Sequence, residues 1–222
     1  MNKVFTFIAV LFFITLIHIK TVAQDKSFSL EGGIVNSSVP IYTTQPLSRV
    51  SSKQPMRNLS FVASYSQMLT KKYSLKTELS FKVEGVTTLN KFLDQEGFFI
   101  HSASLNYFSL GLLPQTEICF RKIDIAFNAG FSLSYLVKAN LANYEIVNSI
   151  LSDVVGERRD FRKVDFGLIG LVSIKRVIAN ELKLILSLRQ YQGLRSVLAD
   201  EPDRKVHMSN SIVSLGVECP LK

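Results

Sequence analysis

The chain has 222 residues, a formal net charge of +8, two cysteines and no tryptophan, and 47% of its residues are hydrophobic. After residue 19 no apolar run is long enough to cross a membrane as a helix, which excludes a helical protein with several spans. Neither cysteine lies in a CxxC motif or a His-Cys cluster, and we expect no metal and no cofactor. We also expect no nucleic-acid partner, since part of the basic charge lies in the leader described next.

Residues 1–23 have the three parts of a secretory signal. Lys3 precedes the apolar run from Val4 to Ile19, and Thr21-Val22-Ala23 follows it. The alternative is an uncleaved membrane anchor, but the run is shorter than the roughly 20 residues that span a bilayer. We therefore expect cleavage after Ala23, which leaves residues 24–222 as one outer-membrane β-barrel domain.

Eight stretches of alternating apolar and polar residues follow between Ser27 and Cys219. The stretch 73–84 is the clearest, because its odd positions are mostly apolar and its even positions are polar. The stretches 123–137 and 182–189 repeat the pattern, and each has about nine or more residues, enough to cross a membrane as a tilted strand. The sequence predicts an all-β fold, an eight-stranded antiparallel up-and-down transmembrane barrel.

The connections between these stretches alternate in length. Short connections are expected at 70–72, 121–122 and 175–180, and long ones at 36–57, 87–100, 139–163 and 193–208. Outer-membrane barrels have short periplasmic turns and long external loops, so both mature termini are expected in the periplasm.

Two connections have further features. The short ones are basic, and Lys175-Arg176 is expected in a turn that could meet phospholipid headgroups. In the third long loop, residues 143–155 are apolar enough to predict a short helix.

Alternation alone does not separate the inside of a barrel from its outside. A soluble lipocalin-like barrel would bury the apolar positions, whereas a membrane barrel turns them toward lipid. Strand length, the predicted signal and the loop asymmetry favour the membrane. We therefore expect outer-membrane lipid as a partner, in a Gram-negative bacterium.

Charged residues on the inward positions are expected to pair with one another in a packed polar core. A barrel of eight strands has an interior just wide enough for its own side chains, so we do not expect an open diffusion pore, and a small-solute porin remains an alternative. The predicted network comprises Lys76, Glu78, Lys82, Glu84, Asp124, Asp165, Lys183 and Arg189.

One short motif suggests a catalytic alternative. His207-Met208-Ser209-Asn210 is similar to the HxSN motif of barrel enzymes that remove acyl chains from lipopolysaccharide, with His207 as base and Ser209 as nucleophile. Those enzymes orient the histidine with an acidic residue on a following strand. Here the motif lies on the last expected strand of the barrel, and Glu218 is expected at the opposite membrane edge. We therefore expect a protein that is not an enzyme.

Five segments carry a resemblance to a known family: Tyr107 to Phe120, Ile123 to Val137, Val164 to Gly170, Tyr191 to Leu194, and Asn210 to Gly216. They resemble the strands of the outer membrane protein beta-barrel domain found in Bacteroidetes, labelled the PorT or porin family. The resemblance implies the barrel fold and says little of activity, although one branch of the family assists protein secretion across the outer membrane. The leading hypothesis is a non-enzymatic scaffold or interaction protein that contacts a protein partner through its long loops or periplasmic turns.

Overall fold

The computed structural model describes residues 26–38, 49–70, 72–92, 97–121, 123–147, 150–153, 161–179, 181–196 and 207–221. Every statement below concerns this part of the chain. Its elements are all strands: β1 (Lys26–Ser38), β2 (Arg49–Met68), β3 (Tyr73–Phe92), β4 (Gly97–Phe120), β5 (Ile123–Val147), β6 (Ile150–Asp153), β7 (Val164–Ala179), β8 (Leu182–Gly193) and β9 (Ser209–Leu221).

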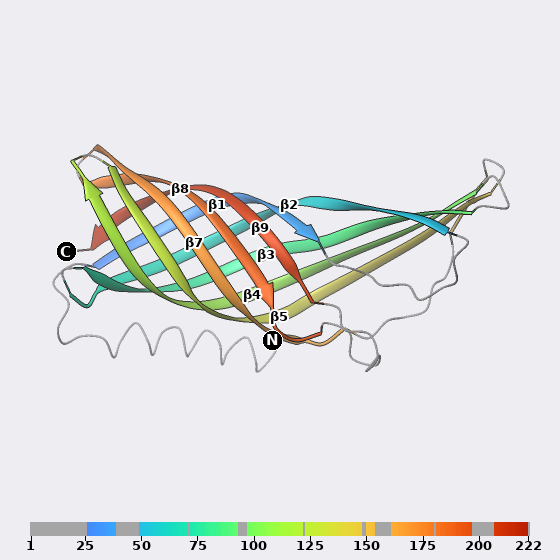
Figure 1. Ribbon diagram of the computed structural model, residues 1–222, viewed down its shortest axis with the longest axis horizontal. Coiled ribbons are helices and arrows are strands. Elements are labelled where there is room, and N and C mark those ends of the chain that lie inside the picture. Colours follow the sequence, from blue (N-terminus) through green and yellow to red (C-terminus); the bar gives the residue numbers. More distant parts are fainter. Residues whose placement is uncertain are drawn as a thin grey trace.

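The strands form a closed barrel (Figure 1). Neighbours along the chain pair antiparallel, and β1 pairs with β9 from Lys26↔Leu221 to Ser38↔Ser209, which closes the sheet. The short strand β6 pairs with the end of β5, so eight strands make up the barrel wall. This confirms the predicted eight-stranded antiparallel barrel. Within the described residues, no helix has the length and hydropathy needed to cross a bilayer.

Side chains alternate between the two faces of the wall, most clearly on β7 and β8. On β8, Leu186 and Leu188 are 49% and 56% exposed. Ser187 and Arg189, the residues that follow each of them, are 1% and 3% exposed. The strand β7 repeats the alternation from Val164 to Lys175. On these two strands most outward residues are apolar and most inward residues are polar, as a wall in contact with lipid requires.

The two ends of the barrel differ, and we call them the short-turn end and the long-strand end. At the short-turn end, β4 and β5 are joined by Arg121 and Lys122, and Arg121 has a φ of 44°. The connection from β7 to β8 has Glu181 at a φ of 70°. At the long-strand end, β2, β3, β4 and β5 continue far beyond the ends of β7, β8 and β9 (Figure 1).

Three predicted connections at the long-strand end are wrong. The expected loop 36–57 is strand at both ends, since β1 runs to Ser38 and β2 begins at Arg49. The expected loop 87–100 is largely strand, since β3 runs to Phe92 and β4 begins at Gly97. The expected helix over 143–155 is the end of β5 and the strand β6. Backbone pairing explains these differences, because each added residue of β2, β3 or β4 gains a neighbour on the adjacent strand.

One predicted turn at the short-turn end is also misplaced. Strand β7 continues to Ala179, and Lys175 lies within it, opposite Asp124 of β5 and Ile185 of β8. Lys175 is 4% exposed and points into the barrel. Its ion pair with Glu218, described below, offsets the cost of burying an ammonium group.

Candidate functional site

The centre of the lumen holds four charged side chains, which we call the central group: Glu31, Lys76, Glu78 and Arg189. Arg189 Nη2 lies 2.8 Å from Glu78 Oε1, and Lys76 Nζ lies 3.1 Å from Glu78 Oε1 and 3.4 Å from Glu31 Oε1. None of the four residues is more than 4% exposed. Two cations and two carboxylates make the group neutral, which is what a buried charge set needs.

The central group crosses the barrel. Lys76 and Glu78 lie on β3 and Arg189 lies on β8, and these strands stand on opposite sides of the eight-stranded ring. Glu31 comes from β1, and Ser214 of β9 donates a hydrogen bond of 2.7 Å to its second carboxylate oxygen. The Arg189–Glu78 pair therefore bridges the lumen from wall to wall.

A second cluster, the aromatic group, lies nearer the long-strand end and comprises Lys82, Glu84, Tyr107, Asp165 and Tyr191. Lys82 Nζ lies 2.6 Å from Glu84 Oε1 and 3.7 Å from the centre of the Tyr191 ring, a cation–π contact. The Tyr191 hydroxyl donates a hydrogen bond of 2.6 Å to Asp165 Oδ2. Both tyrosines belong to an apolar cluster that fills the lumen here, with Leu105, Leu113, Leu136, Ile169 and Met208.

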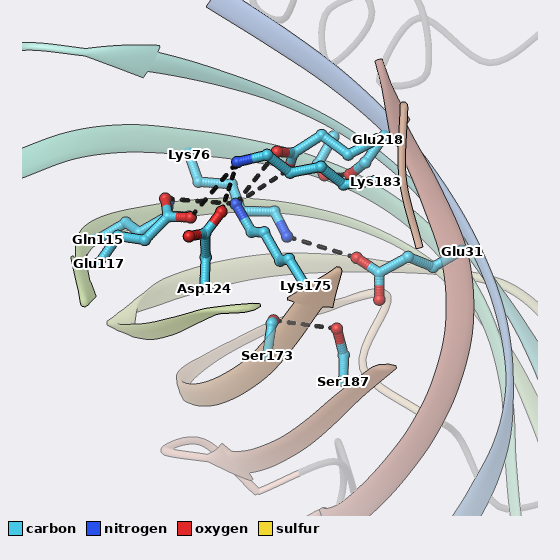
Figure 2. Close-up of polar contacts among 12 residues, drawn as sticks. Glu31, Lys76, Gln115, Glu117, Asp124, Ser173, Lys175, Lys183, Ser187 and Glu218 are labelled. Atoms are coloured by element: carbon cyan, nitrogen blue, oxygen red, sulfur yellow. Dashed lines mark hydrogen bonds and ion pairs between the residues drawn. The ribbon is translucent and has the colours of Figure 1, made fainter. Parts of the chain in front are cut away.

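The third cluster, the mouth group, lies at the short-turn end and comprises Glu117, Asp124, Lys175, Lys183 and Glu218 (Figure 2). Lys183 Nζ lies 2.7 Å from Asp124 Oδ2, and Lys175 Nζ lies 3.0 Å from Glu218 Oε2 and 3.5 Å from Glu117 Oε2. Lys175 and Glu218 are buried, whereas the side chains of Lys183, Glu117 and Asp124 are 28%, 24% and 15% exposed.

Glu117, Cys119 and Asp124 place their potential ligand atoms within 4.8 Å of one another. Lys183 already contacts both carboxylates, at 3.9 Å and 2.7 Å. An ammonium group at that distance neutralises the charge that would attract a cation. We therefore describe this set as ion pairs rather than as a metal centre.

The eight charged residues expected in the interior fall into all three clusters. Lys76, Glu78 and Arg189 meet in the central group, Lys82, Glu84 and Asp165 lie in the aromatic group, and Lys183 pairs with Asp124 in the mouth group. Sequence reasoning missed Glu31, Glu117, Lys175 and Glu218, and the two tyrosines. The alternation within each strand could have predicted Glu31 and Glu218 as inward, since they follow the outward apolar residues Leu30 and Val217.

The residues of the HxSN motif lie at the long-strand end. Gln190 Nε2 donates a hydrogen bond of 3.2 Å to Ser209 Oγ, and Ser211 Oγ donates one to Gln190 Oε1. His207 precedes β9 and is partly exposed. Glu218, on the same strand, contacts Lys175 at the other end of the barrel and is not placed to orient the histidine.

Comparison with known proteins identifies the fold family. Residues 22–199 match the model of an outer membrane protein beta-barrel domain. No curated protein sequence matches the chain. The protease OmpT of Escherichia coli is 8% identical, with a TM-score of 0.51 over 91% of this chain and 99% of that one. OprG of Pseudomonas aeruginosa is 9% identical, with a TM-score of 0.50 over 88% of this chain and 95% of that one. The neisserial surface protein NspA is 11% identical, with a TM-score of 0.49 over 87% of this chain and 95% of that one.

The likeness to OmpT overturns the expectation that this chain is not an enzyme. An outer membrane protease has the same kind of barrel over 91% of the chain, so the architecture gives no ground for excluding catalysis. At such low identity the likeness concerns the fold alone and assigns no catalytic residue here.

Proposed function

We propose, from the premise that this chain belongs to the outer membrane protein beta-barrel domain family and so resides in the outer membrane, that it is an interaction protein. The barrel anchors the molecule in the membrane. The long ends of β2, β3, β4 and β5 form a sheet that reaches beyond the membrane and contacts a protein partner.

The observation that carries this proposal is the unequal length of the strands. β4 and β5 have 24 and 25 residues, whereas β8 and β9 have 12 and 13. A tilted strand of roughly 9–11 residues crosses a bilayer. The excess of about a dozen residues at about 3.3 Å per residue therefore projects on the order of 40 Å beyond the shorter strands.

The projecting part, which we call the sheet extension, is continuously paired. It consists of residues 49–55 of β2, 86–92 of β3, 97–103 of β4 and 141–147 of β5. The register runs from Arg49↔Phe92 through to Gly97↔Val147, so the strands share their backbone hydrogen bonds without a break in this region. A paired sheet holds a binding surface in place better than separate loops do.

The proposal includes an orientation and a processed N-terminus. The long-strand end faces the outside and the short turns face the periplasm, as in other barrels of this class. Residues 1–23 are removed on export. The family match beginning at residue 22 supports this boundary, because the barrel domain starts where the apolar leader ends.

A finer role is part of the proposal. The segments from Tyr107 to Phe120 and from Ile123 to Val137 resemble strands of the family in Bacteroidetes without singling out one branch, and one branch of that family assists protein secretion across the outer membrane. On this reading the partner is a component of a secretion system. Crosslinked partners identified by mass spectrometry would include such a component if the finer assignment holds.

The test of the main proposal is crosslinking in intact cells. A photoreactive residue is placed at Thr88, His101 or Asn143, which lie side by side on β3, β4 and β5 within the sheet extension. Control positions are Leu188 and Val213 on the outer wall. We expect protein adducts from the extension and lipid adducts from the wall. Lipid adducts alone from all five positions would contradict the proposal.

The porin alternative makes a different prediction. Because the central group bridges the lumen and the aromatic group fills it, we expect no steady open channel when the purified protein is inserted into planar lipid bilayers. A stable conductance of porin size would favour the alternative.

A further inference from the structure

Four strands connect the sheet extension to the barrel. The pairing of β1 with β2 ends at Ser37↔Met56, and the pairing of β5 with β7 ends at Tyr135↔Val164. Beyond this level the described pairings join β2 to β3, β3 to β4, β4 to β5, and β5 to the short strand β6. The closed wall therefore ends here, and the extension continues as an open sheet (Figure 1).

Two of the four connecting strands carry one extra residue where the extension begins. In β2, the four residues 56–59 lie opposite the three residues 83–85 of β3. In β5, Val137 is the extra residue, opposite the step from Asn106 to Tyr107 of β4. A bulge of this kind interrupts the ladder of hydrogen bonds and bends the strand that carries it.

The two bulges lie at the same level of the sheet, which we call the hinge line. Residues 83–85 of β3 pair with residues 104–106 of β4, and the β5 bulge follows directly beside residue 106. By contrast, β3 and β4 pair with each other without any shift from Tyr73↔Thr116 to Lys91↔Phe98. The β3–β4 hairpin is therefore continuous across the hinge line, whereas the strands on either side of it are interrupted there.

The side chain of Ser37 fills the gap between β2 and β3 at the hinge line. The Gly85 amide donates a hydrogen bond of 2.8 Å to Ser37 Oγ, and Ser37 Oγ donates one of 2.6 Å to the Gly85 carbonyl. Ser37 lies on β1, and β2 stands between β1 and β3 in the sheet. Strands two positions apart are separated by about 10 Å, so this serine reaches Gly85 only because β2 is displaced. The hydroxyl takes the place of the ladder bonds, since no described residue of β2 pairs with Gly85.

The packing of β5 changes across the hinge line. Below it, Leu136 is 8% exposed and belongs to the apolar cluster that fills the lumen. Above it, Lys138, Ala139 and Asn140 are exposed in succession, and successive residues of a strand point to opposite faces. No described layer therefore covers either face of β5 there, and packing against the barrel does not fix the direction of this strand.

We propose that the sheet extension turns as one body about the hinge line, with the β3–β4 hairpin as its support and the Ser37 hydroxyl as the latch that holds its angle. The latch ties Gly85, on the continuous hairpin, to β1, which belongs to the barrel wall and ends at Ser38. A hinge consists of a few residues that absorb the change in backbone direction, and the two bulges supply them. The ion pairs of the central group lie deeper in the barrel and keep it closed while the extension moves. The inference goes beyond the proposed function, because it requires neither a partner nor an orientation in the membrane.

The test measures distances between pairs of spin labels by pulsed electron paramagnetic resonance on the purified full-length barrel in lipid nanodiscs. The exposed cysteines are first replaced, as Cys119→Ser/Cys219→Ser, and new cysteines carry the labels. The hinge pair joins Thr88 of the extension to Leu186 of the wall. The extension pair joins Ser52 of β2 to Asn143 of β5, and the barrel pair joins Leu112 to Leu186, both of which are exposed on the wall.

Three variants are compared in each labelled protein. Ser37→Ala removes the latch, and Ser37→Thr keeps a hydroxyl at the same position. Ser29→Ala is the matched control, because Ser29 is also buried on the inner face of β1 but contacts Ser64 of the adjacent strand β2 and does not cross the hinge line.

We expect Ser37→Ala to widen the distance distribution of the hinge pair about twofold or more, because the Gly85 amide and carbonyl lose their partner. Ser37→Thr and Ser29→Ala should keep the wild-type width, and the extension and barrel pairs should not change in any variant. An unchanged hinge pair in Ser37→Ala would overturn the proposal, as would equal widening in Ser29→Ala or Ser37→Thr. Widening of the extension pair or the barrel pair to the same degree would show fraying or general loosening instead of a hinge. No partner takes part in this measurement, so its failure leaves the crosslinking test intact, and the reverse also holds.

Discussion

The Arg189–Glu78 ion pair provides the sharpest test of the barrel interior. The substitution Arg189→Met keeps most of the side-chain volume and removes the charge. The central group then holds two carboxylates and one ammonium group, all of them buried. Removing one partner of a buried ion pair costs about 3–5 kcal/mol of the free energy of unfolding, because the remaining charge lacks compensation.

The pairing can be separated from the loss of packing with a double variant. Glu78→Gln alone leaves an excess positive charge and should cost a similar amount. In Glu78→Gln/Arg189→Met, Lys76 and Glu31 remain as a neutral pair 3.4 Å apart. The double variant should therefore lose about 2 kcal/mol less than the sum of the two single variants.

Urea unfolding in lipid vesicles measures these energies, followed by far-UV circular dichroism because the chain has no tryptophan. Lys183→Met is the matched control. Lys183 lies 2.7 Å from Asp124, as close as the Arg189 pair, but its side chain is 28% exposed, so its loss should cost about 1 kcal/mol or less. The reasoning is refuted if Arg189→Met costs no more than Lys183→Met, or if the single effects simply add.

Three further predictions concern the wall and its turns. A Cβ on Gly167 would lie 2.5 Å from the Tyr191 ring, whereas one on Gly170 of the same strand would meet nothing within 4 Å, so Gly167→Ala should cost about 1–3 kcal/mol of unfolding free energy and Gly170→Ala under about 1 kcal/mol. Equal costs in urea titrations would contradict the packing described. Leu188→Arg should cost about 2–4 kcal/mol in vesicles if the wall faces hydrocarbon, and a change below about 0.5 kcal/mol would argue against that placement. Arg121→Gly should raise the unfolding midpoint slightly, because a residue other than glycine at a φ of 44° carries about 1 kcal/mol of strain; a lower midpoint would be the opposite of this expectation.

The strands of the barrel wall could be predicted from the sequence because the alternation of apolar and polar residues is visible within each strand alone. The stretch from Tyr73 to Glu84 fixes its own two faces without knowledge of its neighbours, and the same is true of Leu182 to Arg189. Inward placement of Lys76, Glu78 and Arg189 follows from that alternation. Whether the apolar face lies against lipid or in a soluble core could not be decided from alternation, and this choice needed other evidence, such as strand length.

The pairings and the projecting sheet could not be read in this way. Which carboxylate meets Arg189 depends on the stagger between β3 and β8, which are 111 residues apart at the contact. The end of β3 and the start of β4 fall in the expected loop 87–100. Their strand conformation depends on hydrogen bonds from neighbours that a single segment does not contain. The expected turn at 175–180 begins too early, because the local sequence does not show that Glu218 of β9 pairs with Lys175 inside the barrel.

The wall-to-wall ion pairs also constrain how the protein can assemble. In a bilayer, oily side chains gain little by choosing one hydrocarbon neighbour over another, so the outer surface selects no particular alignment of one strand against the next. A slip of one residue in any strand would turn Glu31, Glu78 or Arg189 out into the acyl chains. The polar lining therefore selects the register of the strands, because a slipped strand would leave its charged residue in hydrocarbon and the partner of that residue unpaired in the lumen.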